Sequence, residues 1–381
     1  MSILFFHTSI GFYIISKMSD SETTKKVYVG MSGGVDSSVA AALLKEQNFD
    51  VVGVFIKIWH PTISNCDWKS EMRDAMRACA HLHIPFKMID LSDLYFEKVI
   101  GYMINEYENG RTPNPDVMCN EIIKFGAFYD WALNEGAQFV ATGHYAQISE
   151  YNNEIVMSQG VDSGKDQTYF LWRIKKEQLK NILFPVGSYT KSEIRKLAEK
   201  FSLPNAAKKD SQGLCFIGDI NVKQFLKNHI DAKQGDVLNV NGEVIGSHDG
   251  AFLYTYGERH GFIITNNSSQ NKPHFVIGKD LEKNTITVSE EISLVENVQS
   301  ELLLEDYNKL VSDSVNKDVS KNIVAMCRYH AELIPCSLEV ITETSTKISF
   351  KNPQERIAEG QSVVLYSEGV CIGGGVVSSL K

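Results

Sequence analysis

The stretch VYVGMSGGVDSSVAAALL, residues 27–44, constrains the fold more than any other part of the sequence. Alternating apolar residues predict a strand over 27–31, a turn rich in glycine and serine follows, and an alanine-rich helix begins directly after the turn. Glycines let a backbone approach an anion closely, and the start of a helix presents unpaired N–H groups together with the positive end of its dipole. The junction therefore predicts an anion-binding loop at the end of a strand.

Strand and helix patterns keep alternating after this junction. Strands are predicted over 27–31, 50–59, 85–92 and 138–145, and helices over 37–47, 70–83, 94–110 and 120–136. This order is typical of an α/β doubly wound parallel sheet, in which ligands gather at the carboxyl ends of the strands. The glycine loop at 30–34 and the Thr-Gly-His at 142–144 both follow predicted strands. We expect them to meet in space.

The pattern of predicted strands and turns changes at two later points in the sequence. Short strands with Asn-Gly and Gly-Lys turns follow from about residue 235, and strands dominate again from about 298. We therefore predict a catalytic domain over 25–220, a small mixed or β central domain over 221–297, and an antiparallel β-barrel over 298–381. Residues 166–210 are expected to be helical and basic. Ten lysines and arginines between 173 and 210 face four acidic residues, which fits a solvated helical face or a phosphate-binding surface equally well.

The first residues do not have the pattern of a targeting or membrane segment. The apolar run in MSILFFHTSIGFYIISKM is interrupted by His7, Thr8 and Ser9, falls short of a span of ~20 residues, and lacks a basic start and a cleavage site. We therefore expect no membrane attachment. Residues 1–24 are expected to be a disordered extension, or translation truly starts at Met18. An N-terminal peptide beginning at Met1 would contradict that start.

Composition and cysteine spacing narrow the class of protein. Hydrophobic residues make up 43% and charged residues 22%, as in ordinary globular proteins, and the net charge of −9 gives no overall signal for nucleic acid. The seven cysteines (66, 79, 119, 215, 327, 336 and 371) include no CxxC pair. That spacing excludes a zinc ribbon or an iron–sulfur site of the CxxC type, so we expect no metal site of the protein's own, and a cytoplasmic location.

The SGGVDS loop is neither a Walker A motif nor a GxGxxG dinucleotide loop. Read on its own, it is either a phosphate loop or a glycine turn with an Asp or Ser helix cap, and Asp36 binds Mg²⁺ or caps the helix. The loop resembles that of the N-type ATP pyrophosphatases, which cleave ATP to AMP and pyrophosphate to activate a carbonyl oxygen. This resemblance implies an adenine nucleotide alpha hydrolase-like fold, with ATP and Mg²⁺ as cofactors.

Two cysteine-containing motifs narrow the resemblance. GRTPNPDVMCNEIIKFG (110–126) and KKDSQGLCFIG (208–218) resemble the two cysteine motifs of the tRNA-specific 2-thiouridylases. Further matches to that family extend over most of the chain after Lys25: ATGHYA (141–146), KDQTYFLW (165–172), GEVIGSHDG (242–250), VIGKDLEKN (276–284), CRYH (327–330) and GQSVVLYSEGVCIGGG (360–375). The lid loop around Cys66 and the YTYGERHG segment depart from the family pattern.

The chemistry of oxygen-to-sulfur replacement explains why two cysteines are needed. ATP activates the oxygen, one thiol carries a persulfide, and a second takes up the resulting disulfide, so both must become accessible thiolates. The resemblance implies that Cys119 is the nucleophile, Cys215 the persulfide carrier, and that they form a transient disulfide. Cys119 is expected near a helix start, Cys215 in an exposed loop, and Asp116 is a plausible proton acceptor or else a turn residue.

The resemblance also implies the contacts to ATP and tRNA. Those expected to bind ATP are Gly30, Met31, Ser32, Gly33, Gly34, Val35, Asp36, Ser37, Ile56 and Gly143. Those expected to contact tRNA are Asn114, Pro115, Asp116, His144, Lys165, Asp166, Gln167, Arg328, Tyr329 and Gln361. An arginine beside a tyrosine suits an unstacked loop base next to a phosphate.

The leading hypothesis is a tRNA-uridine 2-sulfurtransferase that uses ATP and relayed sulfur. The family implies tRNAs for Lys, Glu and Gln as substrates and a sulfur-relay protein or cysteine desulfurase as partner, and a monomer is the default. An amide-forming synthetase would need a glutaminase domain or an ammonia channel, and a cluster-dependent thiolase would need CxxC pairs. A non-catalytic tRNA chaperone would have a degenerate loop or lack one of the two cysteines.

Overall fold

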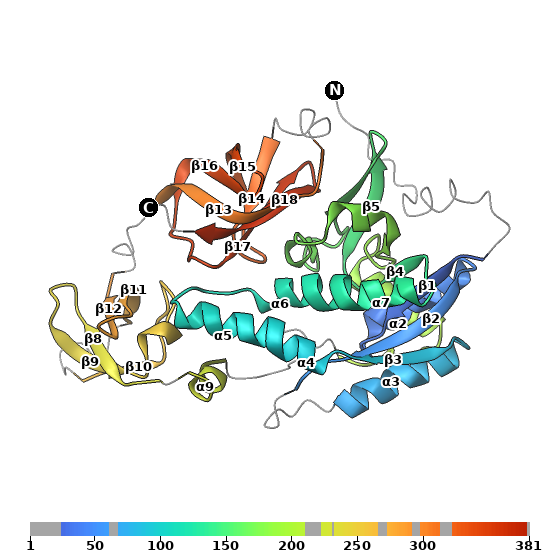
Figure 1. Cartoon of the computed structure of the whole chain (residues 1–381), viewed down its shortest axis with the longest axis horizontal. Coiled ribbons are helices and arrows are strands. Elements are labelled where there is room, and N and C mark those ends of the chain that lie inside the picture. Colours follow the sequence, from blue (N-terminus) through green and yellow to red (C-terminus); the bar gives the residue numbers. More distant parts are fainter. Residues whose placement is uncertain are drawn as a thin grey trace.

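The structure, a computed structural model, describes residues 24–60, 68–209, 222–230, 232–265, 273–291, 298–312 and 322–378. The expectations for residues 1–23, for Cys66 and for Cys215 lie outside these ranges. The described chain forms a parallel sheet with helices, a small mixed sheet and an antiparallel barrel (Figure 1). The predicted fold class is therefore confirmed.

The first sheet contains five parallel strands in the order β3-β2-β1-β4-β7. Their bounds are β1 Lys26–Gly30, β2 Asp50–Lys57, β3 Phe86–Asp90, β4 Phe139–Ala141 and β7 Ile182–Leu183. The chain runs outward from β1 to β2 and β3, then returns to β4 on the other side of β1. In α/β sheets, ligands bind at the carboxyl ends of the two strands that flank such a reversal.

Alternation along β1 divides the core into two layers. Val27 and Val29 pack in a cluster with α2 (Val35–Glu46), α3 (Trp68–His81) and α8 (Lys191–Lys200). Tyr28 packs on the opposite face, in a cluster with α4 (Ser92–Tyr95), α5 (Gly101–Glu108), α6 (Pro115–Met118) and α7 (Phe128–Asn134). Residues in a strand alternate between faces, so a buried run such as VYV serves a sheet covered on both sides.

Two of the helices contain wide, π-helical stretches. α4, the π-helical η1 (Phe96–Ile100) and α5 follow one another without a break, as do α6, the π-helical η2 (Cys119–Ala127) and α7 (Figure 1). The second helix starts with Pro115 after an Asn114 cap whose Oδ1 accepts the N–H of Val117 at 3.3 Å. Proline and asparagine suit these positions, because the first turn leaves N–H groups unpaired. The helix predicted over 120–136 thus begins five residues earlier.

The basic segment 166–210 is less helical than expected. It contains the 3₁₀ turns η3 (Thr168–Phe170) and η4 (Lys176–Asn181) and one regular helix, α8. Buried Leu171, Trp172 and Ile174 draw the connecting chain into the core, so the segment does not present one continuous helical face. α8 starts with a capping box in which Thr190 and Glu193 satisfy each other's backbone N–H groups.

The remaining strands form two further sheets. The central one has the order β10-β9-β8-β12-β11 and is mixed, because β8 and β12 are parallel. Its bounds are β8 Gly235–Leu238, β9 Val244–His248, β10 Phe262–Ile264, β11 Phe275–Asp280 and β12 Thr285–Ser289, with α9 (Val222–Lys227) before it and the turn η5 (Ala251–Leu253) within it. None of the helices in the described parts of the chain is both long and apolar enough to cross a membrane.

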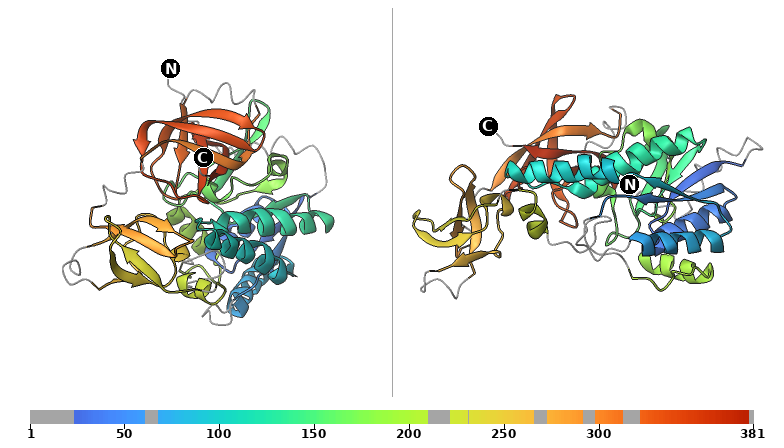
Figure 2. Two further views of the ribbon diagram at one scale, coloured as in Figure 1. Left: turned by 60° about the vertical axis from the view of Figure 1, so that its left-hand side comes forward. Right: turned by 60° about the horizontal axis from the view of Figure 1, so that its bottom comes forward.

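The C-terminal barrel is closed by β13 pairing with both β16 and β18. Its strands are β13 Gln299–Lys309, β14 Ile323–Met326, β15 Ile334–Thr342, β16 Ser345–Gln354, β17 Ser362–Ser367 and β18 Val370–Ser378. A hairpin from the catalytic region, β5 (Ala146–Tyr151) and β6 (Glu154–Gln159), extends this sheet through the pairing of Ser158 with Val370. No sequence pattern predicted this addition. Figure 2 shows the barrel beside the helices of the catalytic region.

Candidate functional site

The loop between β1 and α2 is a tight, self-bonded turn. Gly33 has a φ of +76°, and a Cβ at this position would lie 2.3 Å from the carbonyl oxygen of Glu71. Ser37 Oγ accepts the N–H of Ser32, and Ser32 Oγ accepts that of Gly34, both at 3.2 Å. Gly34 is the N-cap of α2, and no described side chain caps the helix there. The alternative of an Asp or Ser cap is therefore wrong, and the helix start is suited to an anion.

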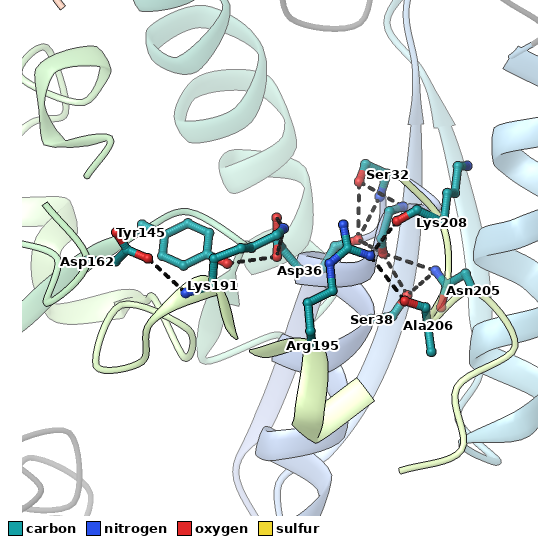
Figure 3. Close-up of polar contacts among 12 residues, drawn as sticks. Ser32, Asp36, Ser38, Tyr145, Asp162, Lys191, Arg195, Asn205, Ala206 and Lys208 are labelled. Atoms are coloured by element: carbon teal, nitrogen blue, oxygen red, sulfur yellow. Dashed lines mark hydrogen bonds and ion pairs between the residues drawn. The ribbon is translucent and has the colours of Figure 1, made fainter. Parts of the chain in front are cut away.

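Asp36 points away from the helix end and is held by two partners (Figure 3). Lys191 Nζ lies 2.7 Å and 2.8 Å from its two carboxylate oxygens, and the hydroxyl of Tyr145 donates to Oδ1 at 2.9 Å. Lys191 opens α8, where its backbone N–H donates to Asp162 Oδ2 at 2.8 Å. The sequence suggested neither partner, because both are brought to the loop by tertiary structure.

A segment after α8 clamps the carbonyl side of the loop (Figure 3). The buried Asn205 Nδ2 donates to the carbonyls of Gly33 and Gly34 at 3.0 Å and 3.1 Å, and to Ser38 Oγ at 2.9 Å. Lys208 Nζ lies 3.3 Å from the Gly33 carbonyl and 2.8 Å from the Asp74 carboxylate. Because the carbonyl oxygens are satisfied from this side, they do not oppose an anion on the other.

Asn205→Ala should loosen the phosphate loop. Both carbonyls lose this donor but keep another, Lys208 for Gly33 and the Ser38 hydroxyl for Gly34. The change therefore costs about 0.5–1.5 kcal/mol, which makes local opening about 2- to 13-fold more frequent. Amide hydrogen exchange of a peptide covering 27–44 measures this opening, and Asn241→Ala in an exposed turn is the control. Equal exchange in the two variants would show that the clamp contributes nothing.

The predicted ATP residues do come together at the carboxyl ends of β1 and β4. A Cβ on Gly30 would lie 3.7 Å from Ile56 Cδ1, and one on Gly143 would lie 2.7 Å from the backbone nitrogen of Ser37. Met31 and Val35 are buried in the core, so only their backbone can face a ligand. Gly143 therefore lets the two strand ends approach each other closely.

His144, expected to contact tRNA, is buried beside these strand ends. Its Nδ1 lies 2.8 Å from Thr142 Oγ1, and its Nε2 lies 3.3 Å from Nζ of the buried Lys124. Burial, reinforced by the charge of Lys124, holds the pKa of His144 well below its usual value. The imidazole is therefore neutral at pH 7 and positions Lys124 rather than facing solvent.

This burial predicts a pH dependence of stability. Below about pH 6.5 the unfolded chain protonates His144, whereas the folded protein does not. The free energy of unfolding therefore has its full value above that pH. Below it, this free energy falls by up to about 1.4 kcal/mol per pH unit. Urea unfolding at pH 7.5, 6.5 and 5.5 should show a shallower acid loss for His144→Asn. His83→Asn, at an exposed positive-φ position, is the control. Parallel losses in wild type and His144→Asn would contradict the prediction.

Cys119 lies in a second cluster, around the start of the α6–η2–α7 helix. It is 0% exposed and packs with Val117 and Ile123, so it is not the accessible thiol that the sequence suggested. It is the fifth residue of the helix and faces the core, whereas Asn114 and Asp116 before it are half-buried. Its neighbour Asn120 is also buried and donates to the carbonyl of Phe170 at 3.0 Å.

Aromatic residues from two distant segments lie beside this helix start. The ring centroids of Phe170 and Tyr329 are 4.4 Å apart, and Tyr169, 6.0 Å from Tyr329, donates its hydroxyl to the carbonyl of Ser362 at 2.9 Å. Burial raises the pKa of Tyr329, and the nearby charges of Asp166 and Asp116 raise it further. Arg328 and Tyr329 are exposed. The structure thus gathers the NPD motif, the 165–170 segment and the CRYH motif.

Two of the remaining residues predicted to contact tRNA accept hydrogen bonds from within the protein. The buried Asp166 accepts the N–H of Gly160 at 2.9 Å and the hydroxyl of Thr168 at 2.7 Å, while Gln167 Oε1 accepts the N–H of Tyr145 at 3.0 Å. Both hold the turn before η3. Lys165 and Gln361 are half-buried, and Gln361 Oε1 has no hydrogen-bond partner among the described residues.

One helix connects the two clusters. Phe128 Cε1 would lie 3.6 Å from a Cβ on Gly30, whereas Cys119 lies nine positions earlier in the same helix, at most about 14 Å away at ~1.5 Å per residue. Lys124 lies between them and contacts His144. One helix thus runs from the cysteine motif to the end of β1, where the phosphate loop begins.

The other described cysteines have the environment of packing residues. Cys79, Cys327 and Cys371 are buried. Burial raises the pKa of Cys79, Cys327 and Cys336 to about 12 and that of Cys371 further. Such thiols are inert at neutral pH. Within the described ranges, no group of three or more His, Cys, Asp or Glu side chains could hold a metal ion.

Known protein families and relatives match nearly the whole chain. Family models match three successive regions: a "tRNA methyl transferase HUP domain" over residues 25–219, a "tRNA methyl transferase PRC-barrel domain" over 223–290 and an "Aminomethyltransferase beta-barrel domain" over 299–377. A tRNA-specific 2-thiouridylase MnmA from Listeria innocua is 41% identical over 95% of this chain and 97% of its own length. The one from Staphylococcus epidermidis is 41% identical over 93% and 95%.

A third relative of the same description, from Staphylococcus carnosus, is 42% identical over 95% of this chain and 97% of its own length. Matches of this identity span all three sheets, and the expected resemblance is confirmed. The chain belongs to the tRNA-specific 2-thiouridylase family.

Proposed function

We propose that this protein is a tRNA-uridine 2-sulfurtransferase, which replaces the 2-oxygen of the wobble uridine by sulfur in an ATP-dependent reaction. The observation that carries the proposal is the helix that begins at the NPD–Cys119 motif and passes the end of β1, where Phe128 lies beside Gly30. On this proposal the thiol and the phosphate-binding loop serve one reaction. The family membership supports the same reaction.

The residues around the loop fit ATP. N–H groups are left for phosphates at the start of α2, because no side chain described there caps the helix. The positive φ of Gly33 and the bonds from Asn205 to the loop carbonyls turn the backbone so that its carbonyls lie away from the phosphates. ATP supplies an adenylate leaving group for the uridine oxygen. Asp36 is the carboxylate suited to Mg²⁺, which proteins usually hold by one or two carboxylates together with substrate phosphates. When Asp36 holds Mg²⁺, the ammonium of Lys191, which pairs with Asp36 in this structure, is available to the phosphates.

The target base fits the cluster around the helix start. A wobble base must leave the anticodon stack to react, and Tyr329 offers an exposed aromatic face next to Phe170. Arg328 beside it suits a phosphate of the loop. Asp116 lies close enough to influence Tyr329 and serves as proton acceptor.

Sulfur arrives on Cys215 as a persulfide, supplied by a sulfur-relay protein or a cysteine desulfurase. The Cys119 thiolate attacks the inner sulfur of this persulfide, and the bond to the outer sulfur breaks. The outer sulfur takes the place of the adenylated uridine oxygen, which leaves with AMP, and a thiol reductant reopens the Cys119–Cys215 disulfide. Because Cys119 is fully buried, the helix start must rearrange when tRNA binds. The substrates are the tRNAs for Lys, Glu and Gln, and the protein acts as a monomer in the cytoplasm.

Reconstitution tests the proposal. Purified protein, unmodified tRNA, ATP, Mg²⁺ and a persulfide donor should give 2-thiouridine at the wobble position, with one pyrophosphate released per uridine converted. Nucleoside mass spectrometry and a pyrophosphate assay measure the two products. Pyrophosphate released without tRNA and accompanied by another acylated or amidated product would contradict the proposal, as would modification at a different position.

A further inference from the structure

The short connection between α5 and α6 contacts both the central domain and the barrel. In Figure 1 the end of α5 lies beside the central sheet, and the chain returns from there to α6 below the barrel. From the barrel side, the carbonyl of Glu359 accepts the N–H of Thr112 at 2.8 Å, and a Cβ on Gly360 would lie 2.9 Å from that nitrogen. From the central domain, Thr255 Oγ1 lies 3.3 Å from Thr112 Oγ1.

Lys279 makes the second contact from the central domain. It belongs to β11, and its Nζ donates to the carbonyl of Gly110 and, at 3.1 Å, to the carbonyl of Tyr254. The side chain is half-buried, and among the described residues no carboxylate lies within ion-pair distance of its Nζ. Burial lowers its pKa to about 8, although the carboxylates of Glu359 and Glu258 act in the opposite direction. An ammonium withdrawn from water depends on such carbonyls, because they replace its lost hydration.

The same junction joins the central domain to the barrel. The guanidinium of Arg356 lies 4.2 Å from the ring centroid of Tyr256, and the Lys279 ammonium lies 6.0 Å from it. Arg356 also lies 3.9 Å from Glu359, whose carbonyl holds Thr112. The turn at 110–112 therefore bonds to both later domains at once.

We infer that Lys279 is a positioning residue for thiolation, which fixes the turn at 110–112 and thereby the placement of Asn114, Asp116 and Cys119. Only Pro113 separates Thr112 from the Asn114 cap, so a displaced turn displaces the start of the helix. This inference rests on the proposed roles of Asp116 and Cys119. A shift of about 1 Å in a reacting group costs about 100-fold in rate, even when it arises away from the chemistry.

Lys279→Met tests the inference by removing the ammonium while keeping the length of the side chain. We expect the rate at saturating tRNA and ATP to fall about 10- to 100-fold, while the KM for tRNA stays within about threefold. Lys279→Arg keeps a donor for the carbonyls and should recover most of that rate. Lys283→Met, on the same hairpin but with a 79% exposed side chain, should behave as wild type.

Several outcomes would overturn the inference. They are a Lys279→Met rate within twofold of wild type, a loss confined to the KM for tRNA, or equal rates for the Met and Arg variants. If Lys279→Met does not fold, Thr255→Val removes the other central-domain contact and should lower the saturating rate about 3- to 10-fold, again without a change in KM. An unchanged rate there would also overturn it. Failure of the proposed function itself is distinct, because wild type would then make no 2-thiouridine or Cys119→Ser would stay active.

Discussion

Cys119→Ser should lower the rate of 2-thiouridine formation at least about 1,000-fold, because a serine hydroxyl can neither attack the persulfide nor take up the disulfide. The substitution changes one atom at a site that is 0% exposed, so the fold should persist. Binding of tRNA should stay within about twofold. Pyrophosphate release should continue, since activation of the oxygen does not use the thiol. Single-turnover thiolation and pyrophosphate assays on the same sample separate the two steps.

Cys79→Ser is the matched control for this prediction. Cys79 is equally buried in the same domain, on α3, where its sulfur packs over Gly53. It should lose a little stability and no catalytic rate. Full activity of Cys119→Ser, or an equal loss in both variants, would show that Cys119 is a packing residue.

Gly143→Ala should abolish ATP-driven pyrophosphate release, with a loss of at least about 100-fold in kcat/KM for ATP. The new Cβ would lie 2.7 Å from the nitrogen of Ser37 and 2.8 Å from the carbonyl carbon of Asp36. Both are backbone atoms, so the loop itself must shift. A shift at this point moves the N–H groups that we propose to hold the phosphates. Pyrophosphate release and the binding of a fluorescent ATP analogue measure the effect.

Gly101→Ala provides the comparison for this variant. Gly101 starts α5, and the closest atom to its Cβ would be the Phe96 carbonyl oxygen at 3.8 Å. Alanine is the better helix former there by about 0.5–1 kcal/mol. This variant should retain ATP use and unfold at a slightly higher temperature. Activity of Gly143→Ala within threefold of wild type would place ATP elsewhere than the carboxyl ends of β1 and β4.

Local sequence patterns were sufficient to predict the parallel sheet and the loop. The strand before Ser32 and the helix after Gly34 can be read from hydrophobic period and glycine placement, and both are local properties. The approach of Gly143 to Ser37 followed from a rule about parallel strands, since both lie at carboxyl ends. The antiparallel barrel was likewise predictable from strand density.

Features that depend on distant residues escaped prediction. The pairing of Asp36 with Lys191 joins residues 155 positions apart, and the Asn205 clamp depends on a turn without a motif of its own. The burial of Cys119 follows from which helix face meets the core, and the π-helical stretch shifts that face. His144, in the loop after β4, is buried because Lys124 and Phe125 of that stretch lie against it. The segment 166–210, expected to be helical and basic, is interrupted by the buried Leu171 and Trp172.

The join between the β5–β6 hairpin and the barrel has a consequence for how the chain is made. Trp172 is fully buried against Gly374, where a Cβ would lie 2.8 Å from the indole, and Asn308 donates to the carbonyls of residues 172 and 174 at 2.6 Å and 2.8 Å. A ribosome that has finished the catalytic region has yet to produce these partners. Since domains generally fold as they emerge, the nascent chain must keep a tryptophan and a strand edge uncovered until the last strand is released. The catalytic region thus reaches its mature form last, together with the C-terminal strand.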